Sequence, residues 1–178
     1  MNIKEDIKVG LLSEIIALQN GYIPSKASQI RIAATLHDIG KQKIPESILN
    51  KPSKLTPEEF EIIKTHTILG AKMLKNIQGD LGQFSRNICL YHHEWFDGNG
   101  YWGKKLNDLP LYISFVAISD VFSALISKRI YKDAWPPSEA IEYIQNKAGT
   151  QFSPELVNTF ISLIQKDSSI PVIMYGGN

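Results

Sequence analysis

Apolar residues recur at helical spacing along almost the whole chain, and this periodicity limits the possible folds more than any other feature of the sequence. Between Leu11 and Leu18 the apolar residues stand three and four positions apart, up to a helix stop at Asn20 and Gly21. No stretch alternates apolar and polar residues over a useful length, as a half-buried strand would. The pattern therefore predicts an all-α fold.

Further helices are expected over residues 25–40, 56–76, 84–93, 110–127, 138–147 and 154–165. Ser25 and Ser153 can cap the first and the last of them. Thr56-Pro57-Glu58-Glu59 is a capping box with proline at the first helical position. The helix over 110–127 is apolar on most sides and is expected to lie centrally. Residues 95–109 contain three glycines and no helical period, so we expect a loop there.

The 178 residues suit one domain, which we place over residues 1–167, followed by a C-terminal tail over 168–178. Cys89 is the single cysteine and lies in an apolar run, as is typical of a buried residue in a reducing compartment. No apolar stretch reaches the roughly 18 residues of a membrane helix, and the first residues lack the apolar region of a signal peptide. We therefore expect a cytoplasmic protein with no membrane segment.

The charges are almost balanced, because 19 basic residues face 18 acidic ones and give a formal net charge of +1. Broad electrostatic binding to nucleic acid needs a strongly basic surface. We therefore expect no DNA binding, and any affinity for phosphate has to be local.

All four histidines stand in segments that can supply metal ligands. With two aspartates they form the set His37, Asp38, His66, His92, His93 and Asp120. Neutral imidazole and carboxylate suit Zn, Mn, Ni or Fe, and an aspartate such as Asp38 can bridge two metals through its two oxygens. The alternative is a group of unrelated core and capping histidines. The order of the six residues favours a divalent-metal hydrolase.

Several phrases match one known family in both wording and spacing. They are HDIGK at 37–41, His66, HHEWFDGNGYW at 92–102, SDVFSAL at 119–125, KRIYKDAWPPSEA at 128–140 and AGTQFSPELV at 148–157. Over about residues 5–165 the chain thus resembles the HD-GYP family, the branch of the HD phosphohydrolases that hydrolyses cyclic di-GMP in bacterial signalling. The resemblance implies a single-domain HD helical bundle with the extra helices of the HD-GYP branch.

The resemblance also implies two divalent metal ions, either Fe, Mn, Ni or Zn. One would be bound by Asp38, His66, His92 and His93, and the other by His37, Asp38, Asp120 and a histidine from the first helix. The family's His-x-x-Arg-Val pattern aligns with residues 5–9, which puts Glu5 in place of that histidine. Glu5 can either ligate the metal or remain a solvated glutamate near the N-terminus.

Further residues receive roles from the resemblance. Lys41 would act with Asp38 in catalysis by reaching the scissile phosphate, although a lysine after a helix end can also answer the helix dipole. Arg129 and Lys132 would hold the substrate phosphates, where the residues alone suggest a solvated helix end. Gly98 and Tyr101, in the loop that corresponds to the GYP motif, would contact the substrate.

The sequence departs from the family at two further positions. Trp102 replaces the proline of the GYP motif, and Ser123 replaces an aspartate. Loss of the proline is expected to loosen the loop, and Trp102 can either stack on guanine or pack against the protein. These changes bear on substrate fit, and on binding of a signalling-protein partner through the loop, more than on metal binding.

The leading hypothesis is a metal-dependent phosphodiesterase that hydrolyses a cyclic dinucleotide, cyclic di-GMP, to linear pGpG and/or GMP by a metal-activated water. One alternative is a catalytically impaired module that binds a nucleotide or a partner protein. Another is an HD phosphohydrolase with a different nucleotide substrate.

Overall fold

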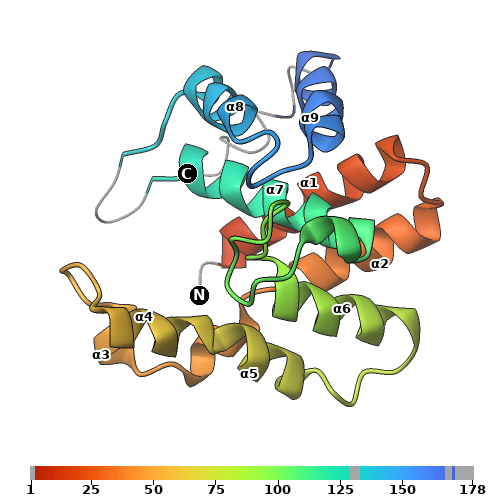
Figure 1. Ribbon diagram of the computed structural model, residues 1–178. Helices are drawn as coiled ribbons and strands as arrows, with labels where there is room; N and C mark the ends of the chain where they lie inside the picture. The colour runs from red at the N-terminus through yellow and green to blue at the C-terminus, as the bar shows by residue number, and fades with distance from the viewer. Residues whose placement is uncertain (1–2, 129–132, 167–169, 171–178) are drawn as a thin grey trace.

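The computed structural model describes residues 3–128, 133–166 and 170, and these residues form helices and loops without a β-strand (Figure 1). The α-helices are α1 (Ile3–Gln19), α2 (Pro24–Ala34), α3 (Glu46–Leu49), α4 (Pro57–Lys64), α5 (His66–Met73), α6 (Gly79–Tyr91), α7 (Leu111–Ile126), α8 (Pro137–Asn146) and α9 (Pro154–Lys166). Two 3-10 helices, η1 (Ile39–Lys43) and η2 (Leu106–Asp108), lie in the connections. The predicted all-α class is confirmed.

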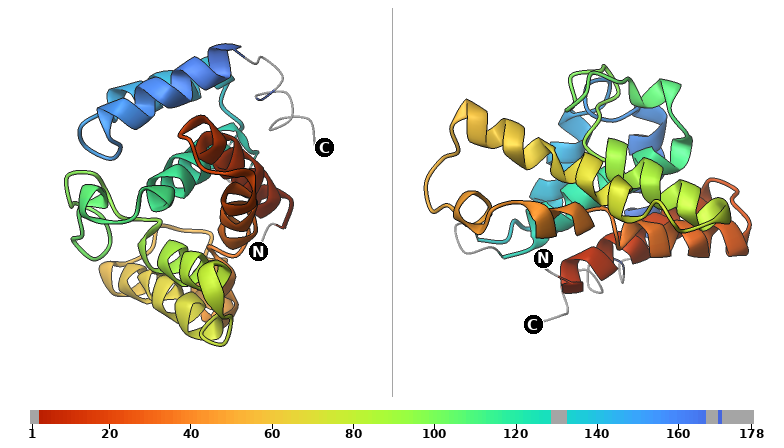
Figure 2. Two further views of the ribbon diagram at one scale, coloured as in Figure 1. Left: turned by 90° about the vertical axis from the view of Figure 1, so that its right-hand side faces the viewer. Right: turned by 90° about the horizontal axis from the view of Figure 1, so that it is seen from below.

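Helix α7 is the central element of the bundle, as its apolar sequence predicts. Phe115, Ile118 and Phe122 are fully buried, and α7 contacts α1, α6 and α8. Figure 2 shows α7 and α1 in the middle, with α8 and α9 on one side and α4 to α6 on the other. A residue on α7 can therefore face side chains from both halves of the molecule.

Helices α1 and α2 pack closely because Gly10 has no side chain. A Cβ atom on Gly10 would lie 2.8 Å from the Arg31 carbonyl oxygen. Two expectations for α2 are wrong. Ile23 with Pro24 begins the helix without a side-chain cap, so Ser25 does not cap it. The helix also ends at Ala34 rather than near Gly40, which leaves residues 35–38 in a turn.

The helix expected over residues 56–76 is interrupted at Thr65, between α4 and α5. The Thr65 hydroxyl donates to the Ile62 carbonyl oxygen at 2.6 Å, and such bonds from threonine to the preceding turn bend helices. The capping box is present at the start of α4, where Thr56 and Glu59 bond reciprocally. Helix α3 was not predicted, and α6 begins at Gly79 rather than at residue 84.

The 3-10 helix η1 lies directly against α5. A Cβ atom on Gly40 would come within 1.9 Å of the His66 carbonyl oxygen and 2.5 Å of the Gly70 amide nitrogen. Only glycine allows two backbones to approach this closely. The contact holds the turn that contains Asp38 beside the start of α5.

The C-terminal part of the chain is anchored on the same core. The Ser153 hydroxyl accepts a hydrogen bond from the Leu156 amide at 3.1 Å, as predicted for the cap of α9. Ile170 is buried against the main core, although it lies in the predicted tail. The domain end at residue 167 and the rest of that tail are outside the described residues and stay predictions. Within the described residues, none of the helices combines the length and apolar character that a bilayer crossing requires.

We predict that Gly40→Ala destabilises the protein, because the added methyl group would overlap the backbone of α5, so one of the two backbones would have to shift. Overpacking of this kind costs about 1 to 3 kcal/mol in the free energy of unfolding, measured by urea denaturation. Ser47→Ala in exposed α3 is the control and should change that energy by less than about 0.5 kcal/mol. Equal stability of the two variants would contradict the close contact of η1 and α5.

Candidate metal centre

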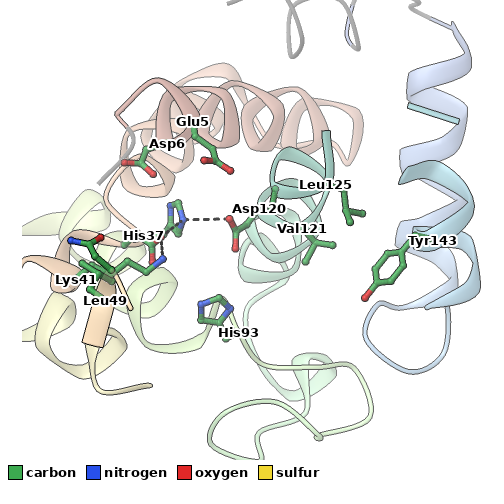
Figure 3. Close-up of a pocket in the computed structure, with 13 residues that line it drawn as sticks. Glu5, Asp6, His37, Lys41, Leu49, His93, Asp120, Val121, Leu125 and Tyr143 are labelled. Atoms are coloured by element: carbon green, nitrogen blue, oxygen red, sulfur yellow. Dashed lines mark hydrogen bonds and ion pairs between the residues drawn. The ribbon is translucent and has the colours of Figure 1, made fainter. Parts of the chain in front are cut away.

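The six predicted ligand residues come from different parts of the chain and converge beside α7. His37 and Asp38 lie in the turn after α2, and His66 is the first residue of α5. His92 is the C-cap of α6 and His93 follows it. Asp120 lies in the middle of α7. Figure 3 shows His37 and His93 turned toward Asp120 across a shared space.

One cluster contains Asp38, His66, His92 and His93, each of which offers a ligand atom within 4.8 Å of the others. The Asp38 Oδ1 atom lies 3.2 Å from His66 Nε2 and 3.8 Å from His92 Nε2. The two Nε2 atoms are 3.5 Å apart. The four donors expected for the first metal therefore meet at one point.

A second group of donors surrounds His37. Its Nε2 atom lies 3.4 Å from Asp38 Oδ2 and 3.6 Å from Asp120 Oδ1. The two oxygens of Asp38 thus face different histidines, Oδ1 toward His66 and His92 and Oδ2 toward His37. Asp38 therefore presents one oxygen to each of the two groups of donors.

Three histidines are oriented by the backbone of the preceding helical turn. The Nδ1 atoms of His37 and His66 each lie 2.7 Å from the carbonyl oxygen three residues earlier. His92 Nδ1 lies 2.9 Å from the Ile88 carbonyl oxygen. A proton on Nδ1 that is donated to a carbonyl leaves Nε2 with its lone pair, which is the orientation that metal-binding histidines require.

Tyr101 positions His93 by ring contact. The ring centroids of Tyr101 and His93 are 4.4 Å apart. The ring of Phe60 packs edge-on against Tyr101, with 5.6 Å between the two centroids. Burial, with the charges of Asp38 and Asp120, raises the pKa of Tyr101 to about 12. The phenol is therefore a neutral group that packs against a candidate ligand.

The charge states of His92, His93, Asp38 and Asp120 suit a cation. Burial lowers the pKa of His93 to about 4 and that of His92 well below its usual range. Burial raises the pKa of Asp38 and of Asp120, but His37 and the other nearby hydrogen-bonding and charged groups together lower it, so the net shift of each pKa is downward and both carboxylates stay ionised. Burial lowers the pKa of His37, but these two carboxylates raise it well above its ordinary value, so a cation bound by His37 would displace a proton from its ring.

A divalent cation fits this set of residues. The Asp38 Oδ1 atom is buried, faces two imidazole nitrogens and has no hydrogen-bond partner among the described residues. A buried ionised oxygen without a partner costs free energy of folding. A metal ion at this point would satisfy it, with His66, His92 and His93 as its other ligands.

The centre opens into a cavity of about 510 Å³, a volume within the range of small-molecule sites. Its lining residues are Glu5, Asp6, His37, Asp38, Lys41, Leu49, Asn50, His93, Asp120, Val121, Ala124, Leu125 and Tyr143. Figure 3 shows the charged groups gathered at one end and Tyr143 of α8 at the other. The Lys41 Nζ atom lies 2.5 Å from Asp38 Oδ2, at the charged end.

Two residues expected near a substrate, Gly98 and Tyr101, are not in this lining. Gly98 lies in the loop after His93, where a Cβ atom would contact Lys105, and Tyr101 faces His93 instead. Arg129 and Lys132 lie outside the described residues, so their roles stay predictions.

The comparisons with known proteins agree with this architecture. The family model described as the HD domain matches residues 2–156. The chain belongs to the HD domain family. Its motifs and the relatives below also confirm the resemblance to the HD-GYP branch, and the histidine and aspartate clusters of this HD domain are those of a divalent-metal site.

A cyclic di-GMP phosphodiesterase of Thermotoga maritima is 43% identical over 157 residues, which are 88% of this chain and 43% of that protein. A 3'3'-cGAMP-specific phosphodiesterase 2 of Vibrio cholerae is 38% identical over 86% of this chain and 30% of its own length. The HD domain thus spans less than half of these relatives. The solved structure of Bd1817, an HDG"Y"P protein of Bdellovibrio bacteriovorus, matches its fold with a TM-score of 0.70 and 21% identity, over 90% of this chain and 51% of that one.

The loop that contains Trp102 was expected to be looser without the family's proline, but hydrogen bonds hold it in place. The buried carboxylate of Glu94 accepts hydrogen bonds from the Trp102 and Lys104 amides, both at 2.7 Å. The Trp102 indole N–H donates to the Thr67 hydroxyl at 3.1 Å. Gly100 permits this fold, because a Cβ there would lie 2.4 Å from Glu94 Cα. Trp102 therefore packs against α5 and ties the loop to it.

Sequence reasoning missed three residues that the structure brings to the centre or its loop: Asp6, Thr67 and Glu94. Glu94 directly follows the histidine pair, so its position was a usable signal. Asp6 stands three residues before buried Val9 and seven before buried Ser13, which places it on the inner face of α1. Nothing in the sequence marks Thr67 as the partner of an indole 35 residues away.

We predict that proline at position 102 does not suit this HD domain. Trp102→Pro removes the amide that donates to ionisable Glu94, and loss of such a bond costs about 1.5 to 3 kcal/mol in the free energy of unfolding. Trp102→Phe keeps the amide and loses only the indole bond to Thr67, for about 1 kcal/mol. Urea denaturation of the two variants measures the difference, and a proline variant as stable as the phenylalanine variant would refute the role of the amide.

Proposed function

We propose that this HD domain is a metal-dependent phosphodiesterase that hydrolyses cyclic di-GMP to linear pGpG and/or GMP. The observation that supports it most directly is the position of Asp38, whose two oxygens face two separate sets of imidazole nitrogens at the charged end of the cavity. Relatives named as phosphodiesterases of cyclic di-GMP and of 3'3'-cGAMP support the substrate class.

Two divalent ions, of Fe, Mn, Ni or Zn, are part of this proposal. Asp38, His66, His92 and His93 would hold one, and His37, Asp38 and Asp120 the other. Such ions supply an activated water and neutralise charge that grows on the phosphate oxygens. The Nδ1 bonds of His37, His66 and His92 orient these side chains before a ligand arrives, so little reorganisation accompanies binding.

Lys41 is proposed as the group that stabilises charge on the scissile phosphate. Its ammonium is at the charged end of the cavity beside Asp38, so it can approach a phosphate oxygen held there. The opposite end offers apolar Val121 and Leu125 and the ring of Tyr143, which suit a base or ribose. By the family resemblance, Arg129 and Lys132 would bind the second phosphate, and the loop with Gly98 and Tyr101 would take part in binding substrate or a signalling protein.

The activity is tested with the purified chain loaded with Mn²⁺ or Fe²⁺ and supplied with cyclic di-GMP, 3'3'-cGAMP or cyclic di-AMP. We expect cyclic di-GMP to be hydrolysed with the highest kcat/KM, read by chromatography of pGpG and GMP. Preference for 3'3'-cGAMP would place the domain with the Vibrio relative. Full metal content without hydrolysis of any of the three would favour a binding module.

We predict that Lys41→Ala lowers turnover by about two to three orders of magnitude while metal content stays near normal, as for other groups that stabilise transition-state charge. Asp38→Ala should abolish both, because it removes the shared ligand. Lys43→Ala, two residues along η1 and exposed, is the control and should leave turnover unchanged. Loss of metal in Lys41→Ala to the same extent as in Asp38→Ala would show that Lys41 is structural.

A further inference from the structure

The two acidic residues at the start of α1 have different surroundings. Asp6 is 7% exposed, whereas its neighbour Glu5 is only partly buried. Asp6 belongs to the buried face of the helix that continues through Val9 and Ser13. Both residues line the cavity, and Figure 3 shows both side chains beside His37. Glu5 is the residue that the family pattern aligns with the first-helix histidine, so the structure and the alignment point to different positions.

The carboxylate of Asp6 lies beside the metal centre and has one buried oxygen without a hydrogen-bond partner. Its Oδ2 atom is buried without a hydrogen-bond partner among the described residues. Asp6 also offers a ligand atom that lies within 4.8 Å of those of His37 and Asp38, a group that does not include Glu5. An ionised oxygen in this position costs free energy unless a cation compensates it.

We propose that Asp6 is the α1 ligand of the ion held by His37 and Asp38, one position after the residue that aligns with the family's histidine. The inference rests on the proposed function only in assuming that this second ion is present. Glu5 then faces the cavity rather than the ion.

The change of ligand gives the two sites different chemistry. The site around His66, His92 and His93 has three imidazoles and one carboxylate. With Asp6, the other site is built on one imidazole, His37, and the carboxylates of Asp6 and Asp38, whose ligand atoms lie within 4.8 Å of one another, whereas Asp120 shares such a group with His37 and His92. Carboxylate-rich sites suit harder ions such as Mn²⁺, and imidazole-rich sites suit Zn²⁺, Fe²⁺ or Ni²⁺. We therefore expect the second site to prefer Mn²⁺ over Zn²⁺ relative to the first.

The matched pair Asp6→Asn and Glu5→Gln tests the assignment, because each variant removes one charge with almost no change in shape. The full chain is stripped with a chelator, reloaded with Mn²⁺, desalted and assayed for metal by mass spectrometry. We expect two equivalents in the native protein, two in Glu5→Gln and one in Asp6→Asn. Asp6→His should restore the second equivalent and shift its preference toward Zn²⁺ in a competition with Mn²⁺.

A stability measurement on metal-free protein separates ligation from folding. Asp6→Asn should unfold at the same or a higher temperature than the native chain in chelator, because a neutral amide is less costly to bury than an unpaired carboxylate. A lower melting temperature would show that Asp6 is structural and overturn the assignment. So would loss of metal from Glu5→Gln alone, or two equivalents retained in Asp6→Asn. In those cases the native chain still binds two ions and the proposed function stands, whereas a native chain without metal overturns both.

Discussion

The negative charge of a buried carboxylate has to be offset by nearby groups. The groups that surround Asp38 come from four parts of the chain. His37 precedes it, Lys41 reaches back from η1, and His66 and His92 approach from α5 and α6. Because Gly40 has no side chain, η1 lies against the backbone of α5, and this contact places Asp38 beside His66. The close contact of η1 with α5 thus affects which histidines the side chain of Asp38 can face.

Interruptions of the helices supply much of this geometry. Helix α2 ends at Ala34 and α4 is interrupted at Thr65, so His37 and His66 lie just beyond these ends. Each ring then finds the carbonyl oxygen three residues earlier for its Nδ1 atom. The Ala34 carbonyl oxygen also accepts the backbone amide of His37, and the Ile63 carbonyl oxygen accepts that of Thr65, so each carbonyl serves both a backbone donor and a ring donor. The irregular positions are therefore the ones that orient the donors.

The sequence predicted much of the fold because its signals are local. The helical periodicity, the capping box at Thr56 and the Ser153 cap depend on residues within one or two turns of each other. The errors concern features that depend on distant parts of the chain. The close approach of η1 to α5 brings Gly40 against His66 and Gly70, and the bonds that hold the loop need Glu94, Trp102 and Thr67 at once. Helix propensity and residue spacing contain no information on contacts between residues that are far apart in the sequence.

The candidate centre divides in the same way. The sequence by itself determined the donor types, which are four histidines with Asp38 and Asp120 in an order typical of the HD domain. The reason is that the types of metal ligand depend on the identity and spacing of the residues. Only the tertiary structure decided how the donors are shared, that Tyr101 lies on His93, and that Asp6 rather than Glu5 comes within ligand distance of His37 and Asp38. Adjacent residues of a helix point about 100° apart, so the packing of α1 against its neighbours selects which of the two is turned inward.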